Sequence, residues 1–212
     1  MLAIPDWVVD FESYRRWAHS ADYPHRGQVS FLDGEIWIDM SREELFTHAD
    51  PRSAYCLALV QIGRQTGQGE FVGAGMFFTN RGADLATEPD GMFYKWSTMK
   101  SGRFQPAAPR MNDYMELTGA PDIVLEIMSP TSERRDKDIL PVLYWKAGIP
   151  EYWLVNACAE AAQFGILRHT EQRYVATPAS DGWSRSDVLG RDFRLVRQTD
   201  PLGHPHFVVE VR

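Results

Sequence analysis

The stretch APDIVLEIMSPTSERRDKDILPVLYWKAGIPEYWLVN, residues 120–156, decides the fold of this 212-residue chain. Its first part, from Asp122 to Met128, is an almost unbroken apolar run, which is typical of a strand buried on both faces. The residues that follow predict a turn, a helix, a second turn and a second strand ending at Asn156. Glu126 interrupts the first apolar run. A bare carboxylate in such a strand is costly unless a cation meets it, so we expect a metal ion, a lysine or an arginine beside Glu126.

Before this block, the sequence predicts a strand hairpin followed by a long helix. Residues 28–32 and 35–40 alternate in polarity and are joined by Asp33-Gly34, a strong signal for a two-residue hairpin turn. The capping-box pattern that starts at Ser41 predicts that a helix begins at once. Asp50-Pro51 predicts a second N-cap with proline at the first helical position, and the helix should stop at Gly67.

Further strands are predicted on both sides of the block. Residues 70–79 form one candidate strand, residues 88–94 begin the next, and the polar segment 97–109 predicts a flexible loop or hairpin tip. Short alternating pieces after residue 160 predict antiparallel strands. The fold class is therefore α/β of mixed α+β character, a central mixed sheet flanked by helices with an N-terminal hairpin and a β-rich C-terminal tail. We expect one domain over 1–212, with its core at about 28–156 and its extension at about 160–212.

Composition indicates an intracellular globular protein. The net charge of −7 argues against a large basic surface but leaves room for a local basic groove. Cys56 and Cys158 lack zinc-ligand spacing, so we expect reduced thiols and a cytoplasmic location. The N-terminus has no signal-peptide pattern, and no apolar run approaches the roughly 20 residues that a membrane-spanning helix needs.

Carboxylates near strand starts are the candidate chemical groups. Asp90 follows Pro89, and Asp122 follows Pro121 on the strand that carries Glu126. Asp122 and Glu126 share a strand face but lie roughly 13 Å apart by the strand rise, too far to share one ion. Asp90 could pair with Glu126 if their strands are neighbours. Two converging carboxylates make a hard-oxygen site suited to Mg²⁺ or Mn²⁺.

The motifs resemble those of a known family. PDIVLEIMSPTS, followed by Asp136, Tyr144 and AGIPEYWLV, is similar to the Uma-type restriction-endonuclease family, much of which is catalogued as a domain of unknown function. The family belongs to the PD-(D/E)XK nuclease-like superfamily. DGEIWIDMS (residues 33–41) and EPDGMF (residues 88–93) match its earlier motifs, and DGWSRSDVLGRDFRL resembles the tail of one branch. The resemblance covers about residues 33–212.

This resemblance implies a helix–three-strand–helix–strand core and a metal site. Asp90 stands where the superfamily keeps its first metal-binding aspartate, and Glu126 where it keeps the acidic residue of the (D/E)xK element. Met128 stands at the position of the motif lysine, and Leu140 at the position from which the family supplies a lysine instead. The nearest lysine is Lys137, one turn earlier on the helix. Two interpretations of Lys137 remain open: it assists the attacking water or the phosphate, or it is a solvated charge.

Six other residues are weaker candidates. His48 falls where the family often has a polar residue facing the site, although a capping role fits equally. Glu35, Asp122 and Ser129 could support the site or act as a surface charge, a strand-start cap and a turn cap. Arg134 and Arg135 could meet phosphates or be solvated.

The leading hypothesis is a metal-dependent endonuclease that hydrolyses phosphodiester bonds, with DNA as the expected substrate. Asp90, Glu126 and the Ile127 carbonyl would bind Mg²⁺ or Mn²⁺, and Lys137 would assist. The alternative is a catalytically impaired nuclease-fold protein that binds nucleic acid or a partner protein. A purely structural role would require Asp90 and Glu126 to lie far apart or to be held by arginines. The resemblance also implies a possible homodimer, and no membrane association is expected.

Overall fold

The computed structural model describes residues 3–107 and 114–212. The strands that it contains form three sheets. The central sheet includes both strands of the block at residues 120–156. In spatial order, its strands are β12 (Tyr174–Ala176), β11 (Gln163–His169), β10 (Glu151–Asn156), β9 (Ile123–Ile127), β6 (Gly91–Lys95) and β3 (Gly69–Gly73). β9 and β10 are parallel, and the other neighbouring pairs in this sheet are antiparallel.

Two further sheets pack around the central one. The first has the order β2 (Glu35–Asp39), β1 (Gln28–Leu32), β5 (Leu85–Thr87), β4 (Phe77–Asn80), β8 (Glu116–Gly119) and β7 (Phe104–Ala107). The second has the order β13 (Ala179–Ser180), β14 (Trp183–Ser186), β15 (Arg191–Thr199) and β16 (Pro205–Val211). The helices are α1 (Phe11–Ala18), α2 (Asp50–Thr66), α3 (Trp96–Lys100) and α4 (Leu140–Lys146), with a 3₁₀ turn η2 (Arg81–Ala83) and π-helical turns η1 (Leu45–Ala49) and η3 (Arg135–Ile139).

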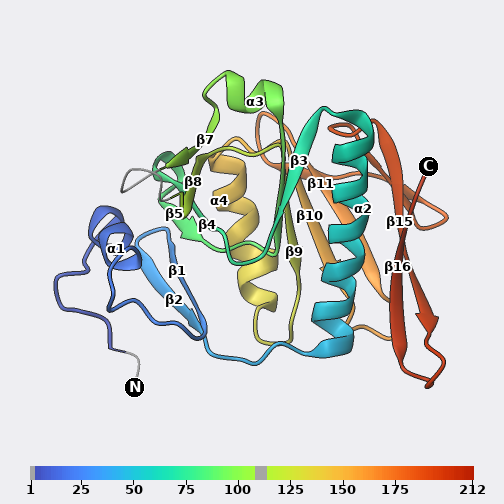
Figure 1. The fold of residues 1–212 in the computed structure, drawn as a ribbon, viewed down its shortest axis with the longest axis horizontal. Coiled ribbons are helices and arrows are strands. Elements are labelled where there is room, and N and C mark those ends of the chain that lie inside the picture. The colour runs from blue at the N-terminus through green and yellow to red at the C-terminus, as the bar shows by residue number, and fades with distance from the viewer. Residues whose placement is uncertain (1–2, 108–113) are drawn as a thin grey trace.

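The alternation of side chains along β9 sends its residues to two different cores. Ile123, Leu125 and Ile127 pack with the buried face of α2, whereas Val124 packs with α4. The two helices therefore lie on opposite faces of the central sheet (Figure 1). Glu126 belongs to the α4 face, so its carboxylate is buried between the sheet and that helix.

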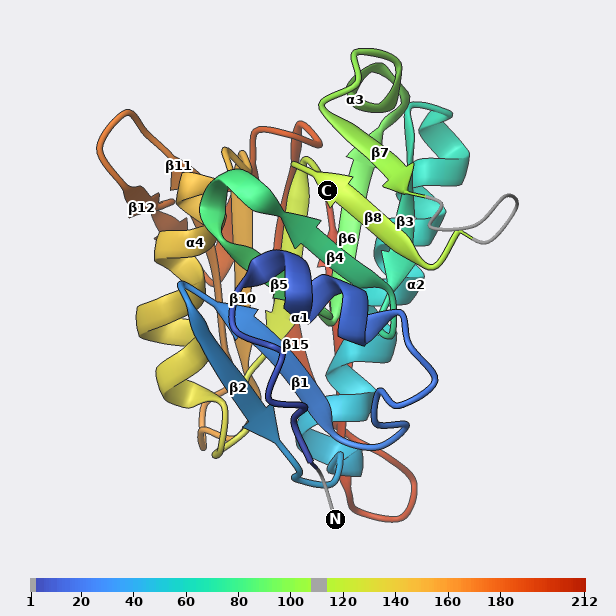
Figure 2. The ribbon, with the colours of Figure 1, turned by 90° about the vertical axis from the view of Figure 1, so that its left-hand side faces the viewer.

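The predicted hairpin forms, and a short helix, α1, precedes it in the chain. Asp33 and Gly34 both have positive φ, which is the backbone geometry that the hairpin turn requires. Asp10 caps α1 in a capping box with Ser13. The aromatic face of α1 packs on β1 through a third core cluster, and Figure 2 shows α1 lying across this sheet.

The prediction of a helix start at Ser41 is wrong. Residues 41–44 are not helical, and the carboxylate of Glu44 instead caps the π-turn η1 by accepting from the Thr47 amide at 2.6 Å. Asp50 is not an N-cap either, because η1 leads directly into α2. Its carboxylate accepts a hydrogen bond from the Phe207 amide of β16 at 2.7 Å, a partner that only the tertiary fold supplies. Gly67 ends α2 in the left-handed conformation, as predicted.

Two other predicted boundaries also differ from the structure. Residues 70–79 are not one strand: the chain turns at Ala74-Gly75, so that β3 joins the central sheet and β4 joins the sheet of β1. The segment 97–109 contains the end of α3 and the strand β7 rather than only a loop, and its last two residues and Arg110 lie outside the described part of the chain. The local sequence marks the breaks, but the pairing of each strand depends on distant partners.

The C-terminal residues extend the fold in two ways. β11 and β12 continue the central sheet beyond β10, while the four later strands form a sheet of their own that packs beside α2 (Figure 1). Phe193 of that sheet contacts Trp153 with ring centroids 4.7 Å apart. The buried Glu151 carboxylate accepts hydrogen bonds from Ser186 Oγ and the Val188 amide, and so ties the third sheet to β10. No helix in the described residues is long and apolar enough to span a bilayer.

Tyr55 provides a test of the core beneath α2. Its hydroxyl is fully buried and has no hydrogen-bond partner among the described residues, and burial raises the pKa of this phenol. An unpaired buried hydroxyl costs about 1–3 kcal/mol, so Tyr55→Phe should raise the free energy of unfolding by about 1 kcal/mol, measured by urea titration. The matched control is Tyr14→Phe, because the Tyr14 hydroxyl donates to the Val29 carbonyl at 2.7 Å. That variant should lose about 1 kcal/mol; equal effects of the two changes would contradict the prediction.

Candidate active site

Asp90 and Glu126 face each other at the same end of two neighbouring strands. β6 and β9 are antiparallel with Gly91 opposite Leu125, which places residue 90 opposite residue 126. Asp90 stands immediately before β6, and its Oδ2 accepts a hydrogen bond from the Ile127 amide at 2.8 Å. Beyond the start of β6, β9 has no strand partner on that side. The Asp90 carboxylate accepts the hydrogen bond of the Ile127 amide in its place. Sheet register brings the two acids together, although 36 residues separate them in the sequence.

Glu126 is the more deeply buried of the two acids, with 1% of its surface exposed. The Tyr144 hydroxyl of α4 donates to its Oε1 at 2.6 Å, and the Arg135 guanidinium lies 3.8 Å from its Oε2. Burial raises the pKa of Glu126 well above its ordinary value; the Arg135 charge opposes this shift, and the charges of Asp136 and Asp90 add to it. The protein thus holds an acid at a position where its charged form is disfavoured.

Arg135 is the buried cation of the site. Its Nε donates to Asp136 Oδ1 at 2.8 Å, and its Nη1 donates to the side-chain oxygen of Gln28 on β1. Burial alone would lower the pKa of Arg135, but the charges of Glu126 and Asp136 raise it. Burial raises the pKa of Asp136 despite the opposing charge of Arg135. The guanidinium therefore links the β1 hairpin, β9 and η3 at one point.

The turn before η3 fixes the direction in which Arg135 points. Ser129 and Ser132 exchange hydrogen bonds, each amide donating to the hydroxyl of the other at 2.9 and 3.1 Å. Ser132 Oγ also donates to Asp136 Oδ2 at 2.5 Å. Serine hydroxyls compete well for local backbone groups at turns, so the SPTS sequence sets the start of the helical segment.

A second wall of the site comes from η1 and α2. His48 and Arg52 are four residues apart and therefore lie on one helical face. His48 Nε2 is 3.5 Å from Asp90 Oδ2, and Arg52 Nη1 is 3.4 Å from Asp90 Oδ1. Glu43 holds both cations from the other side, with its Oε1 2.5 Å from Arg52 Nη2. Burial favours neutral His48, but the hydrogen bond and charge of Asp90 raise its pKa.

Between these walls lies a cleft of about 430 Å³, which we call the polar cleft. The β1–β2 hairpin, η1, the start of α2 and the turn after β9 surround it. Its charged lining residues are Asp39, Arg42, Glu43, Glu44, His48, Arg52, Glu88, Asp90 and Arg135. Burial raises the pKa of Glu88, which reaches the cleft two residues before Asp90.

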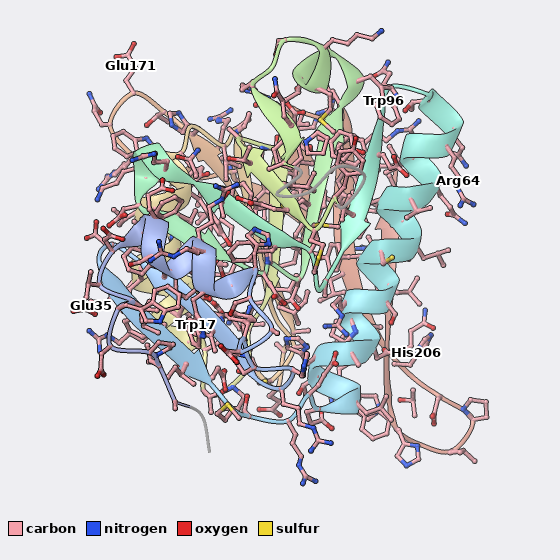
Figure 3. All side chains as sticks on the ribbon, turned by 60° about the vertical axis from the view of Figure 1, so that its left-hand side comes forward. Trp17, Glu35, Arg64, Trp96, Glu171 and His206 are labelled. Carbon is pink, nitrogen blue, oxygen red and sulfur yellow. The ribbon has the colours of Figure 1, made fainter. Side chains whose placement is uncertain are left out.

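Three of the remaining predicted residues lie away from the polar cleft. Lys137 pairs with Glu133 at 2.7 Å, and 43% of its side chain is exposed. The carboxylate of Asp122 accepts from the Lys95 amide and from Thr98 Oγ1, both at 2.7 Å, so it anchors the start of β9 to α3. Glu35 stands beside the hairpin turn and points outward in Figure 3. The structure does not bring these three residues to Asp90.

Other predicted residues lie at or near the polar cleft. Ser129 lines it. Arg134 stacks over the Trp37 ring at 5.5 Å, outside the set of lining residues. Met128 and Leu140, at the two positions where the superfamily and the family place lysine, are buried and apolar. The Ile127 amide contacts Asp90, whereas metal ligation by its carbonyl stays a prediction.

Sequence reasoning missed several groups that the structure brings to Asp90. Arg52 could have been found, because it is one helical turn beyond His48. The sequence predicts for Arg135 a phosphate contact or a solvated charge, and it predicts an arginine as one possible partner of Glu126 without indicating which one. Gln28, Asp39 and the pairing of Tyr144 with Glu126 have no local signal, since hairpin and helix reach the site only through the packing of separate elements.

The donor set fits a hard divalent cation held by few protein ligands. Among the described residues, no three His, Cys, Asp or Glu side chains are arranged as a complete metal cluster. Three buried carboxyl groups, of Asp90, Glu126 and Asp136, lie near one buried guanidinium, that of Arg135. Glu126 Oε2 receives no hydrogen bond from a described residue. Mg²⁺ commonly uses one or two carboxylates and completes its shell with water and substrate phosphate.

Comparison with known proteins agrees with this geometry. A model of the Uma2 family, described as "Putative restriction endonuclease", matches residues 11–198. A solved structure titled as a putative nuclease belonging to DUF820, from Anabaena variabilis ATCC 29413, has the same fold: the TM-score is 0.60 at 17% identity, covering 86% of this chain and 91% of that one. No curated protein gives a significant match. The chain belongs to the Uma2 family.

Proposed function

We propose that this protein is a metal-dependent endonuclease that hydrolyses phosphodiester bonds, with DNA as its substrate. The observation that supports the proposal most is the placement of Asp90 opposite Glu126 beside the polar cleft, in a chain of this family. Asp90 and Glu126, with the Ile127 carbonyl, would hold Mg²⁺ or Mn²⁺. The ion would polarise a phosphoryl oxygen and lower the pKa of a bound water.

The other charged groups of the polar cleft have roles that follow from their positions. Arg52 and Arg135 reach the cleft from opposite walls and can meet the phosphate charge on two sides. The hydrogen bond and charge of Asp90 raise the pKa of His48, whose Nε2 can donate a proton to a phosphate oxygen. Hydrolysis adds water across the P–O bond, leaving a phosphate monoester and an alcohol. In this assignment Arg135 provides the positive charge that the family pattern assigns to a lysine.

Asp90→Asn tests the proposal. Labelled single-stranded and duplex DNA, and RNA of the same sequence, are incubated with the protein and Mg²⁺, Mn²⁺ or EDTA. Cleavage should require the metal, and Asp90→Asn should lower the rate at least about 10²-fold, the scale on which removal of one electrostatic stabiliser acts. Glu35→Gln is the matched control, because it removes an exposed carboxylate away from the cleft. Metal-independent cleavage, or full activity of Asp90→Asn, would refute the assignment.

A second candidate function is a nucleic-acid or protein binding module with an impaired nuclease site. The burial of apolar Met128 and Leu140 and the distance of Lys137 from the cleft favour it. In that case the same DNA would bind without being cut under any metal condition.

A homodimer would present two clefts to the two strands of a duplex. Sedimentation of the protein with and without DNA measures its oligomeric state directly.

A further inference from the structure

A second cavity lies along α2, next to the polar cleft. This cavity, which we call the side lobe, has a volume of about 470 Å³, within the roughly 300–1,000 Å³ range of small-molecule sites. It shares Arg52, Ala74 and Asp90 with the polar cleft. The two cavities therefore meet at the carboxylate to which we assign the metal.

The walls of the side lobe are apolar. Cys56, Leu57 and Val60 project from α2, and Gly73 and Ala74 form the facing wall at the end of β3. α2 and β3 run side by side in Figure 1 and contact each other. Leu57 is 61% exposed, so its side chain is open to contact from solvent.

Sheet register holds the side lobe close to the reacting position. Gly73 pairs directly with Gly91, the residue after Asp90. Arg52 stands at the junction with its Nη1 3.4 Å from Asp90 Oδ1. A phosphate held at this junction by Arg52 and a metal ion would have one neighbouring nucleoside on the side of the apolar walls.

We propose that the side lobe binds the nucleobase and sugar of the nucleotide next to the scissile phosphate. This inference rests on the proposed nuclease function and adds a substrate class to it. The described residues contribute no aromatic ring to the side lobe. Besides Arg52 and Asp90, its polar groups are the Ser53 hydroxyl and the Cys56 thiol. The Ser53 hydroxyl already donates a hydrogen bond to the Ala49 carbonyl at 2.8 Å. The base is held through apolar contact, so identity of the base matters little at this position.

The preferred substrate follows from this mode of binding. A base in a duplex is stacked and paired, and extruding it costs a few kcal/mol. A single strand or a locally opened duplex can place a base in the side lobe without that cost. Single-stranded DNA should therefore bind better than duplex DNA of the same sequence at equal salt concentration.

The experiment fills the side lobe with a side chain. Gly73 has no atom within 4 Å of an added Cβ and is not among the residues with positive φ, so Gly73→Leu fits the strand. Gly165 of β11 has the same two properties and does not line the side lobe, which makes Gly165→Leu a matched control. The probes are short single-stranded oligonucleotides in which one abasic residue is moved stepwise along the chain. Affinity is measured by fluorescence anisotropy in a Glu126→Gln background without divalent metal, so that the DNA is not cut and Arg52 alone holds the phosphate at the junction.

The measured quantity is the ratio of affinities for the intact and the abasic probe. At one position of the abasic residue, the ratio should be about tenfold in the Glu126→Gln parent and with Gly165→Leu, given the apolar area of a base. With Gly73→Leu it should fall to about one. A tenfold ratio that survives Gly73→Leu, or a ratio of one at all positions in the parent, overturns the inference.

Two further outcomes are separable from these. Cleavage by the wild-type protein can depend on Asp90 while the affinity ratio of intact to abasic probe is one at all positions. In that case the proposed function stands and the side-lobe inference fails. If Gly73→Leu converts a dimer into monomers in sedimentation while the base effect is absent, a second copy of the chain occupies the side lobe, and the inference is again overturned.

Discussion

Replacing Glu126 with glutamine should abolish cleavage and, in the absence of metal, stabilise the protein at neutral pH. Glutamine keeps an acceptor for the Tyr144 hydroxyl but removes the buried charge, and Arg135 retains Asp136 as its partner. We expect a gain in unfolding free energy at pH 7, because the variant no longer buries a group whose charged form is disfavoured. A loss of activity together with a gain in stability is typical of residues that the site holds at an energetic cost.

The sign of the pH dependence follows from the raised pKa of Glu126. Burial raises the folded-state pKa above the unfolded value, so the folded protein binds this proton more tightly. The contribution of Glu126 to stability is fully present below the unfolded pKa and is lost as pH rises toward the folded pKa. The difference in stability between Glu126→Gln and wild type should therefore grow with pH from about 4.5 upward.

Thermal and chemical unfolding between pH 4 and 8, without metal, measures that difference. Adding Mn²⁺ should then raise the unfolding temperature of the wild type and leave that of Glu126→Gln nearly unchanged, because a ligand stabilises only the state that binds it. Glu35→Gln serves again as the control and should follow the wild type in both measurements. A variant that is less stable than wild type at pH 7, or that keeps the full Mn²⁺ response, would contradict the assignment.

Arg135→Gln has the largest expected effect on stability. Without the guanidinium, the carboxylates of Asp90, Glu126 and Asp136 face one another with no buried cation, and Gln28 loses its partner. Removing one member of a buried ion pair costs about 3–5 kcal/mol, so we expect a loss of this size in urea titration at pH 7. Part of the loss should be recovered at low pH, where the carboxylates are protonated.

Lys137→Gln is the matched control, two residues along the same segment. Its Nζ pairs with Glu133 on the surface, and such i,i+4 pairs contribute about 0.3–0.5 kcal/mol. Cleavage by Lys137→Gln should stay close to wild type. Arg135→Lys keeps the charge but loses the planar guanidinium that binds Asp136 and Gln28 together. The stability of this variant should therefore lie between those of Arg135→Gln and Lys137→Gln. Equal losses from Arg135→Gln and Lys137→Gln would show that Arg135 is not the buried cation on which the site depends.

The sequence by itself determined the parts of this protein that local patterns encode. The apolar run around Glu126, the Asp33-Gly34 turn and the Gly67 stop each carry their signal within a few residues, and all three form as predicted. The family resemblance also located the two acids. The cost of burying Glu126 in such a strand was enough to require a cation beside it.

Only the tertiary structure decided which cation that is. Lys137 and Arg135 are two residues apart in one helical segment, and sequence spacing could not distinguish them. In the fold, Arg135 turns inward because Gln28 from the hairpin and Asp136 both accept from it, whereas Lys137 meets Glu133 in solvent. The side lobe arises in the same way, from the register of β3 against β6 and the packing of α2. These features depend on contacts between segments far apart in the chain, for which no short stretch of sequence carries a signal.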